Sequence, residues 1–411
     1  MTQIRVAVTG FGILSALGRG VESNVKALQE GRSGLIARPE WEAEKLRSRV
    51  SGDIDLEPLR SEFDRKESRF LCDPALLAAL AMRDAIEHAG LDQDTVSNLR
   101  TGLVMGTGGS SVPDAIALAD RMRARGGSKV GAYFVPRIMG SAVTANLSNM
   151  FHIHGHSYSM TSACATSAHT IMHGFDLIRS GRQDRVFAGG AEDINVFCVA
   201  SFDGMNALSI AYNDTPEKAS RPLDRGRDGF VYSGGAGVLV LENFELAQQR
   251  GAKIWAILAG AGASCDGEDM VVPNRIGGEE AMRLSLEDAN LQADQVDYVN
   301  LHGTSTPVGD TVEVEAIQNV FGAHVPSFSS TKSMTGHGLG AAGVQEAIFC
   351  ALMMQGGFLA PNINLEDPEP MVDDLPIVRQ SEDAQIGVAL SNSFGFGGTN
   401  CSLVFKHPEN N

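Results

Sequence analysis

The sequence predicts an α/β protein made of two similar halves. Strand-like apolar segments alternate with helical stretches such as residues 74–89 and 343–355, which is typical of layered sheets and helices. The same kinds of segment recur in the same order in both halves of the chain. The 411 residues, 43% of them hydrophobic, are ample for a large buried core. Two similar halves indicate two sheets related by a pseudo-twofold axis, with helices between and outside them and a functional crevice between the halves.

Four pairs of segments carry the repeat. Residues 4–12 and 254–262 each place an isoleucine six residues before the first glycine of a G-x-G sequence. Residues 101–108 and 297–304 are each a strand that ends in small residues, and residues 157–162 and 327–332 are each a serine-rich strand. Residues 234–241 and 397–405 each place a glycine cluster before a strand. Strand–glycine–helix junctions look alike in many α/β proteins, but four in one order indicate duplication. We expect an N-terminal half over residues 1–250 and a C-terminal half over residues 251–411.

The composition excludes several classes of protein. The formal net charge of −17 argues against non-specific nucleic-acid binding. No apolar run reaches the roughly 18 residues of a membrane-spanning helix, and the N-terminal residues enter a strand pattern at once, which leaves no room for a signal peptide. The six cysteines are scattered without a C-x-x-C pair, so neither a zinc site nor a disulfide framework is indicated. A reducing, cytoplasmic setting fits these features.

Two motifs suggest a bound cofactor or metal, and neither has the required pattern. Gly10 and Gly12 are followed by Gly18 rather than by a glycine three residues on, so the dinucleotide interpretation fails. The three histidines of residues 152–156 have no carboxylate or cysteine ligand nearby in the sequence. We interpret them as a surface group rather than a metal site, because metal sites need ligands from several elements and supporting hydrogen bonds.

Cys164 is the candidate nucleophile. It follows a short strand and opens a helical series over residues 168–178, which stops at Gly181. A thiol at a helix N-terminus faces unpaired N–H groups and the positive end of the helix dipole, and both favour the thiolate that attacks carbon. A free cysteine is more often a buried residue that only fills space. The catalytic interpretation therefore depends on partners elsewhere in the chain.

Two further segments supply candidate partners. An apolar strand over residues 296–301 delivers His302 to its C-terminal end, where α/β proteins place functional groups. Residues 330–343 present Lys332 and His337 five residues apart among glycines and other small residues. A single histidine is more often structural, because imidazole readily satisfies buried carbonyl groups. Together with a helix-capping cysteine, however, these groups form the layout of covalent acyl chemistry.

Four motifs, taken together, resemble those of a known family. They are Ser162-Ala163-Cys164-Ala165-Thr166-Ser167, His302-Gly303-Thr304-Ser305-Thr306, Lys332 with Gly336-His337, and Asn392-Ser393-Phe394-Gly395-Phe396-Gly397-Gly398-Thr399-Asn400. In this order and spacing they resemble the β-ketoacyl-(acyl-carrier-protein) synthases, and the likeness runs from about Val6 to Val404. The resemblance implies the duplicated thiolase fold, a five-layered α-β-α-β-α arrangement with two mixed sheets related by a pseudo-twofold axis. It also implies a homodimer.

The resemblance further implies a reaction, the decarboxylative Claisen condensation of fatty acid elongation. Cys164 would accept an acyl group from a carrier-protein thioester. A malonyl thioester would then lose CO2, while His302 and His337, as neutral imidazoles, donate hydrogen bonds to the enolate oxygen. The tetrahedral oxyanion formed when the enolate attacks would rest on the backbone N–H groups of Cys164 and Phe396. The glycine-flanked Phe396 loop would also serve as a gate.

Other positions receive supporting roles from the same resemblance. Lys332 would supply positive charge near the site, with Glu346 as its carboxylate partner. Thr304 and Thr306 would bind the pantetheine arm of the substrate through their hydroxyls. Gly108 would lie in the acyl pocket, where type II synthases carry a bulkier isoleucine.

The same resemblance implies an acidic carrier protein as partner and no cofactor or metal, because decarboxylation and thioester exchange supply the energy. Carrier protein loaded with acyl or malonyl groups would dock on local basic clusters of a chain that is acidic overall. The candidate docking residues are Arg65, Lys66, Arg69, Arg125 and Lys129.

The subtype and several rival classes stay open. Residues 213–221 resemble the type I synthases, which also elongate cis-unsaturated chains, whereas Ser110 and Ser111 depart from their pattern. A type II synthase and a polyketide ketosynthase subunit are therefore alternatives. A thiolase that uses coenzyme A would need a second cysteine as base, and Cys401 lies past the Phe396 loop. A non-catalytic chain-length partner would lack the nucleophile.

Overall fold

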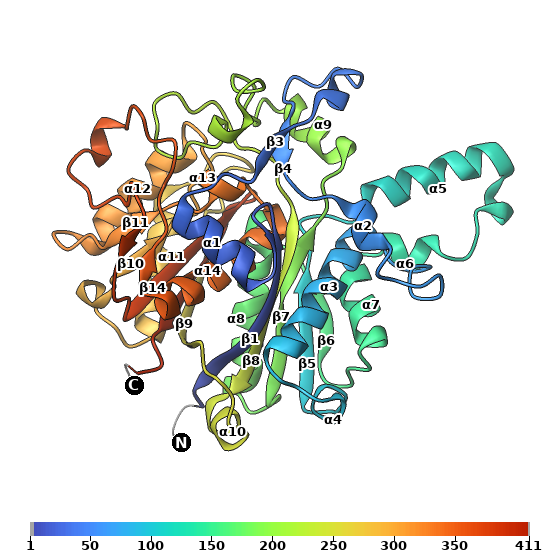
Figure 1. Cartoon of the computed structure of the whole chain (residues 1–411), viewed down its shortest axis with the longest axis horizontal. Helices are drawn as coiled ribbons and strands as arrows, with labels where there is room; N and C mark the ends of the chain where they lie inside the picture. The colour runs from blue at the N-terminus through green and yellow to red at the C-terminus, as the bar shows by residue number, and fades with distance from the viewer. Residues whose placement is uncertain (1–3, 410–411) are drawn as a thin grey trace.

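One mixed sheet of eleven strands forms the centre of the protein, whose computed structural model describes residues 4–409 (Figure 1). The first set of five strands is β6 (Ser157–Met160), β5 (Thr101–Gly106), β7 (Arg185–Glu192), β8 (Gly235–Asn243) and β1 (Val6–Ser15). The second set is β9 (Ala256–Cys265), β15 (Thr399–Lys406), β14 (Val388–Gly395), β10 (Tyr298–Asn300) and β11 (Ser327–Ser329). The remaining strand, β2 (Gly18–Arg19), pairs with β1.

The two sets of strands repeat one topology. From β1 outward the successive pairs are antiparallel to β8, antiparallel to β7, parallel to β5 and parallel to β6. From β9 outward through β15, β14, β10 and β11 the directions are the same. The sets meet where residues 6–8 of β1 pair antiparallel with residues 256–258 of β9, so the two expected sheets are joined at a shared edge.

The strands confirm the duplication predicted from the sequence. The four matched segment pairs fall on β1 and β9, β5 and β10, β6 and β11, and β8 and β15. In each half these strands occupy equivalent places in the sheet. The β7 and β14 pair completes the repeat, although its sequences do not show it.

Helices form layers between and outside the two halves. The central pair is α8 (Thr166–Arg179) and α14 (Ala342–Gly356), and residues 342–354 of α14 are all buried. Both helices contribute to one large apolar core with β1, β8 and β9. The outer layer on the first half contains α3 (Asp73–His88) and α7 (Ala142–Met150), and that on the second contains α11 (Arg275–Asp288) and α12 (Gly309–Phe321).

The duplicated G-x-G sequences serve helix packing. A Cβ atom on Gly12 would lie 1.9 Å from the carbonyl oxygen of Ala81 in α3. A Cβ atom on Gly262 would lie 2.2 Å from the carbonyl oxygen of Ala281 in α11. Each glycine therefore lets an outer helix approach the strand backbone closely, which explains why a glycine pattern that fails as a dinucleotide motif recurs in both halves.

An arm formed by α5 (Val112–Arg125) and α6 (Phe134–Ile138) projects from the body at the right of Figure 1. None of the residues of α5 is buried. The remaining helices and strands are α1 (Val21–Glu30), β3 (Leu35–Ala37), β4 (Val50–Gly52), α2 (Leu56–Arg60), α4 (Gln93–Val96), α9 (Val196–Gly204), α10 (Phe244–Gln249), α13 (Lys332–Thr335), β12 (Phe358–Leu359) and β13 (Glu382–Asp383).

Residues 4–409 lack two features that the sequence analysis considered. No helix in this range is long and apolar enough to cross a membrane. Within the same range, no three histidine, cysteine, aspartate or glutamate side chains are grouped so that they could hold a metal ion. His152, His154 and His156 are exposed between α7 and β6.

Candidate active site

A tight turn between β6 and α8 presents Cys164. The turn is the 3-10 helix Ala163–Ala165, and Ala163 has a φ of 49°, which is uncommon for a residue other than glycine. The carbonyl of Ala163 accepts a hydrogen bond from Oγ1 of Thr166 at 2.7 Å, and the same Oγ1 accepts from the N–H of Ser162 at 2.8 Å. These bonds fix the end of the strand to the start of the helix, and Cys164 between them is only 9% exposed.

The second half contains the equivalent turn without a nucleophile. Leu339–Ala341 forms a 3-10 helix just before α14, and Leu339 has a φ of 48°. Gly340 stands where Cys164 stands in the first half. A Cβ atom on Gly340 would lie 2.3 Å from the backbone nitrogen of Gly108, so this position has no room for a side chain. At the turn before α14 the duplicated fold therefore has no counterpart of the Cys164 thiol.

A cavity of about 380 Å³ occupies the crevice expected between the two halves. Cys164 and Phe230 line it from the first half, and His302, His337 and Phe396 line it from the second. Groups that are far apart in the sequence thus face one space. Cys164 also belongs to an apolar cluster that includes Phe230 and Leu339.

The two histidines come from loops that follow β10 and α13. The His302 and Gly303 N–H groups donate to the two carboxylate oxygens of Glu313, at 2.8 and 2.7 Å, which fixes the loop after β10. The rings of His302 and His337 are perpendicular, at 89°, with centroids 5.3 Å apart. The His337 ring also meets the Phe230 ring edge-on, with a centroid separation of 5.4 Å. Both imidazoles are thus held at the cavity by packing.

The environment keeps both imidazoles neutral. Burial lowers the pKa of His302 and of His337 well below the usual value, and the nearby charge of Lys332 acts in the same direction. A neutral imidazole carries one N–H that can donate a hydrogen bond. Among residues 4–409, no group bonds to Nδ1 of either ring or to Nε2 of His337. These ring nitrogens are therefore buried and unpaired within the described residues.

The resting state of Cys164 differs from the sequence prediction. Burial raises the pKa of its thiol to about 12, although Lys332 and the backbone N–H groups of Phe396 and Cys164 itself act in the opposite direction. The helix end alone therefore does not produce a thiolate at neutral pH, because desolvation of the charge outweighs it. The two N–H groups nevertheless converge on the sulfur position, where they form a pair of donors.

Lys332 lies at the start of α13 and is buried. Its Nζ forms an ion pair with Oε1 of Glu346 on α14, and both side chains are only 2% exposed. Burial raises the pKa of Glu346 to about 7, against the opposing effect of Lys332. Lys332 thus places a positive charge close enough to lower the pKa values of Cys164, His302 and His337.

Thr304 and Thr306 line the cavity, with their Oγ1 atoms 3.1 Å apart. Gly108 is not among the described residues that line it. The N–H of Gly108 instead donates to Oε2 of Glu192 at 2.7 Å, and the N–H of Gly340 donates to the same oxygen at 3.1 Å. Glu192 therefore links the start of the loop after β5 to the turn before α14.

Two carboxylates of this region were not found from the sequence. Glu313 binds the backbone beside His302, and Glu192 binds two glycine N–H groups. Burial raises the pKa of Glu192 to about 8 and that of Glu313 to about 7. The partners of both side chains are backbone groups distant in sequence. The one available signal was a glutamate on the buried face of the helix after the His302 loop.

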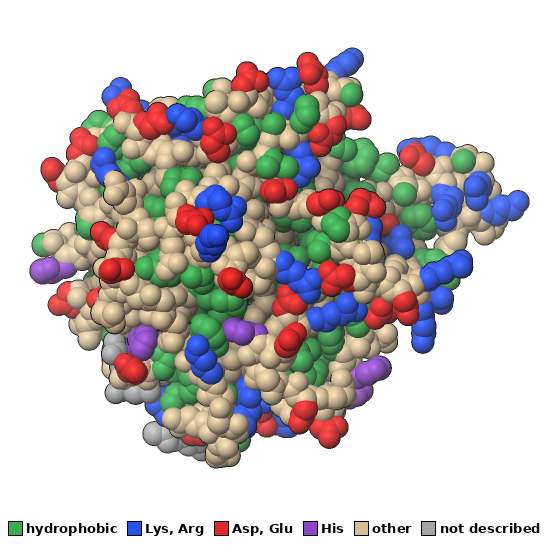
Figure 2. Space-filling view, in the orientation of Figure 1, with side chains coloured by type: hydrophobic (Ala, Val, Ile, Leu, Met, Phe, Trp, Pro, Cys, Tyr) green, Lys and Arg blue, Asp and Glu red, His purple; other side chains and the backbone are tan. Residues whose placement is uncertain are grey.

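The five candidate docking residues are all exposed. Figure 2 shows Lys and Arg side chains gathered over the projecting arm and the loop beside it. The loop of the first predicted cluster contacts the arm that carries the second, because the Arg69 guanidinium lies 5.8 Å from the ring centroid of Tyr133, between α5 and α6. The loop of Arg69 is also bound to α6, since Arg137 donates to the carbonyl of Arg69 at 3.2 Å.

Comparison with known proteins places this architecture in one family. Residues 3–247 match the beta-ketoacyl synthase N-terminal domain, and residues 255–366 match the beta-ketoacyl synthase C-terminal domain. The chain is 49% identical to 3-oxoacyl-(acyl-carrier-protein) synthase 1 of Haemophilus influenzae and 46% identical to the enzyme of that name from Escherichia coli, each over 98% of both chains. The structure of a beta-ketoacyl synthase from Burkholderia phymatum superposes with a TM-score of 0.92 at 34% identity, over 98% of this chain and 99% of that one. The chain therefore belongs to the β-ketoacyl synthase family, and its duplicated architecture is the thiolase-like fold of that family.

Proposed function

We propose that the chain is a β-ketoacyl-(acyl-carrier-protein) synthase that condenses malonyl carrier protein with an acyl group held on Cys164, in fatty acid elongation. One observation carries the proposal. A thiol, two neutral imidazoles and a pair of backbone N–H donors converge on one cavity between the halves. These are the groups that acyl transfer and enolate formation each require.

The first half-reaction loads the enzyme. Sγ of Cys164 attacks the thioester carbonyl of the acyl carrier protein, and the bond from that carbon to the carrier sulfur breaks. The cysteine proton ends on the departing carrier thiol, so no permanent base is needed for a thiol that is protonated at rest. The N–H groups of Cys164 and Phe396 stabilise the tetrahedral oxyanion, and one such donor is worth about 3–4 kcal/mol in related sites.

The second half-reaction forms the new carbon–carbon bond. The malonyl thioester loses its carboxylate as CO2, and the electron pair becomes an enolate whose oxygen accepts hydrogen bonds from His302 and His337. The enolate carbon then attacks the acyl carbonyl, the bond to Sγ breaks, and the released cysteine thiolate takes up a proton from solvent. Neutral imidazoles suit this role, because they donate a hydrogen bond without protonating the carbanion.

The Lys332–Glu346 ion pair supports both steps through charge. The lysine lowers the pKa of the cysteine thiol and holds the histidines neutral. Thr304 and Thr306 bind the pantetheine arm through their hydroxyls. Gly108, whose N–H is bound to Glu192, would lie beside the acyl chain at a position that does not line the cavity described above.

The setting of the reaction completes the proposal. The exposed basic residues of the arm and its neighbouring loop dock an acidic carrier protein. The enzyme acts in the cytoplasm as a homodimer, and the apolar, unburied face of α5 suits contact with a second copy. Its halves divide at about residue 250. The two relatives compared above are both named synthase 1, which favours the type I subtype over a type II synthase or a polyketide ketosynthase subunit.

Substitution of Cys164 tests the proposal. The native protein should convert acyl and malonyl carrier proteins into β-ketoacyl carrier protein, measured by mass spectrometry. Cys164→Gln, which imitates an acylated residue, should lose condensation and keep malonyl decarboxylation. Cys72→Ala, which changes a buried cysteine outside the cavity, is the matched control and should keep both. Condensation by Cys164→Ala would overturn the nucleophile assignment.

A further inference from the structure

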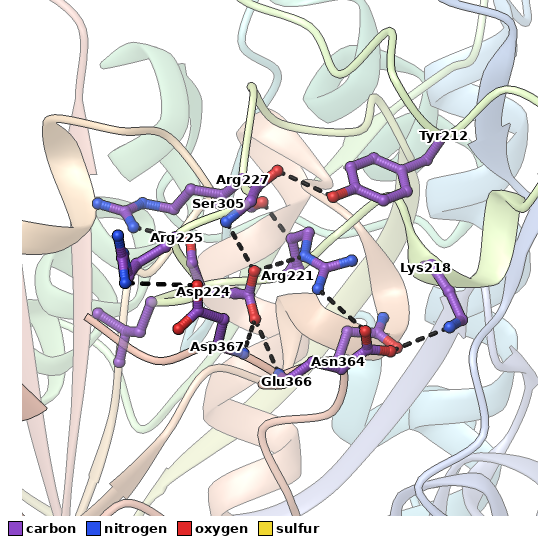
Figure 3. A network of polar contacts seen from close by, with 12 residues as sticks. Tyr212, Lys218, Arg221, Asp224, Arg225, Arg227, Ser305, Asn364, Glu366 and Asp367 are labelled. Atoms are coloured by element: carbon purple, nitrogen blue, oxygen red, sulfur yellow. Dashed lines mark hydrogen bonds and ion pairs between the residues drawn. The ribbon is translucent and has the colours of Figure 1, made fainter. Parts of the chain in front are cut away.

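A buried ionic cluster lies behind the loop that carries Thr304 and Thr306. Figure 3 shows Asp224 between Arg221 and the backbone of Glu366 and Asp367, with Ser305 beside them. Arg221 and Asp224 belong to the long segment between α9 and β8, and neither has a role in the proposed chemistry. The side chains of Arg221 and Asp224 at its centre are only 5% and 1% exposed, so their contacts have a fixed geometry.

Arg227 connects this cluster to the loop. Its side chain is 2% exposed and is not among the residues that line the cavity. Its Nε donates to the carbonyl of Thr306 at 3.0 Å, and one terminal nitrogen donates to the carbonyl of Pro307 at 2.7 Å. The other terminal nitrogen binds Glu369 at 2.6 Å, and Nε lies 3.5 Å from Asp310. One planar guanidinium therefore holds two successive carbonyls and is itself held by two carboxylates.

The residue between the two threonines is in an uncommon conformation. Ser305 has a φ of 72°, which lies in the left-handed region and is uncommon for a serine. Its N–H donates to Asp310 at 3.1 Å, its Oγ accepts from the N–H of Arg221 at 3.0 Å, and its carbonyl accepts from the N–H of Gly229 at 3.2 Å. Such a conformation persists only where the surroundings hold it, and here each polar group of the residue is bound.

The consequence is a defined spacing of the two threonine hydroxyls. Thr304 precedes the left-handed residue and Thr306 follows it, so the reversal of the chain at Ser305 turns both side chains to the cavity. Their Oγ1 atoms lie 3.1 Å apart. If the loop relaxed to an ordinary backbone conformation, the two hydroxyls would separate.

We propose that Arg227 is a positioning residue, which holds the loop around Ser305 so that Thr304 and Thr306 meet the amide-containing pantetheine arm of the substrate. This inference rests on the proposed function and deepens it. Arg227 acts through the loop and does not touch the reacting atoms. Its loss should therefore weaken binding of the arm much more than it changes the chemistry at Cys164.

Kinetics with pantetheine thioesters, which carry the arm without the protein, test this. Arg227→Met should raise KM for acyl- and malonyl-pantetheine by about tenfold and change kcat by less than about threefold. Arg227→Lys should have a KM between those of the native enzyme and Arg227→Met, because an ammonium group cannot bind both carbonyls at once. Alkylation of Cys164 by iodoacetamide, a reagent without the arm, should proceed at the native rate. Arg225→Met is the matched control, since its ion pair with Asp367 is exposed, and should behave like the native enzyme.

Ser305→Ala provides a second variant in case Arg227→Met does not fold. This substitution removes the hydrogen bond between the Arg221 N–H and Oγ of Ser305 and leaves the ion pairs intact. It should also raise KM for the pantetheine thioesters and leave the rate of Cys164 alkylation unchanged. Equal losses of kcat and alkylation with unchanged KM in the folded variants would overturn the inference and indicate a merely structural arginine. If the native enzyme gave no condensation product, the proposed function itself would fail. If the native enzyme were active and the variants had the same KM as the native enzyme, only the inference about Arg227 would fail.

Discussion

Replacing Lys332 with methionine would leave the carboxylate of Glu346 buried without its counter-charge. Methionine matches the length of the lysine stem, so the main change is the loss of the ammonium group. Both side chains are 2% exposed, and water therefore cannot replace the missing charge. The same substitution removes the positive charge that lowers the pKa of Cys164.

The structure sets the size and the pH dependence of the effect. Removing one partner of a buried ion pair costs about 3–5 kcal/mol. Burial already raises the pKa of Glu346 to about 7 with the lysine present, so its loss raises that pKa further. A carboxyl whose folded pKa is raised stabilises the fold at low pH, and this stability is lost as the pH rises through the folded pKa. The deficit of Lys332→Met should therefore be smaller at pH 6 than at pH 8.

Urea unfolding at pH 6 and pH 8 measures these free energies. At pH 8 the free energy of unfolding of Lys332→Met should be lower than that of the native protein by nearly the full cost of about 3–5 kcal/mol. The double variant Lys332→Met with Glu346→Gln should recover most of this loss. Alkylation of Cys164 at pH 8 should be slower in both, because neither restores the positive charge. A deficit below about 1 kcal/mol at pH 8, or a double variant as unstable as the single one, would refute the argument from the uncompensated charge.

Three further outcomes are expected. His302→Ala or His337→Ala should reduce malonyl decarboxylation by about 100-fold or more and leave acyl transfer to Cys164 measurable by mass spectrometry, whereas loss of acyl transfer alone would contradict the enolate role. Because burial holds the pKa of both histidines well below its usual value, the imidazole NMR signals of His302 and His337 should not shift between pH 8 and pH 6, and a titration of either ring near pH 6.5 would show that this imidazole is exposed. Charge reversal at Lys66 and Arg69 should raise KM for carrier protein, most at low salt, and spare pantetheine thioesters; equal effects on both substrates would place docking elsewhere.

Much of the fold was accessible from the sequence because the duplication repeats local patterns. The G-x-G sequences mark sites where a helix packs closely on the backbone of a strand, and such sites have a composition that short segments reveal. The β7 and β14 pair was missed, since two buried apolar strands share only hydrophobicity. The junction of β1 with β9 was also not predicted, because edge pairing leaves no compositional mark.

The site was less accessible, because its electrostatics arise from tertiary contacts. The helix-end position of Cys164 suggested a thiolate, and the degree of burial that raises the thiol pKa to about 12 is invisible in a local segment. Glu192, Glu313 and Arg227 were missed for a related reason. Each binds backbone groups brought close only by the fold, and a backbone group has no residue type for a sequence pattern to display.

A single-turnover experiment tests the central claim most directly. The protein is mixed with one equivalent of acyl carrier protein, and the peptide that contains Cys164 is examined by mass spectrometry before and after malonyl carrier protein is added. The acyl group should be found on Cys164 and should then leave it in step with the appearance of an equal amount of β-ketoacyl carrier protein. An acyl group on another residue, or a condensation product formed while Cys164 stays unmodified throughout, would contradict the account.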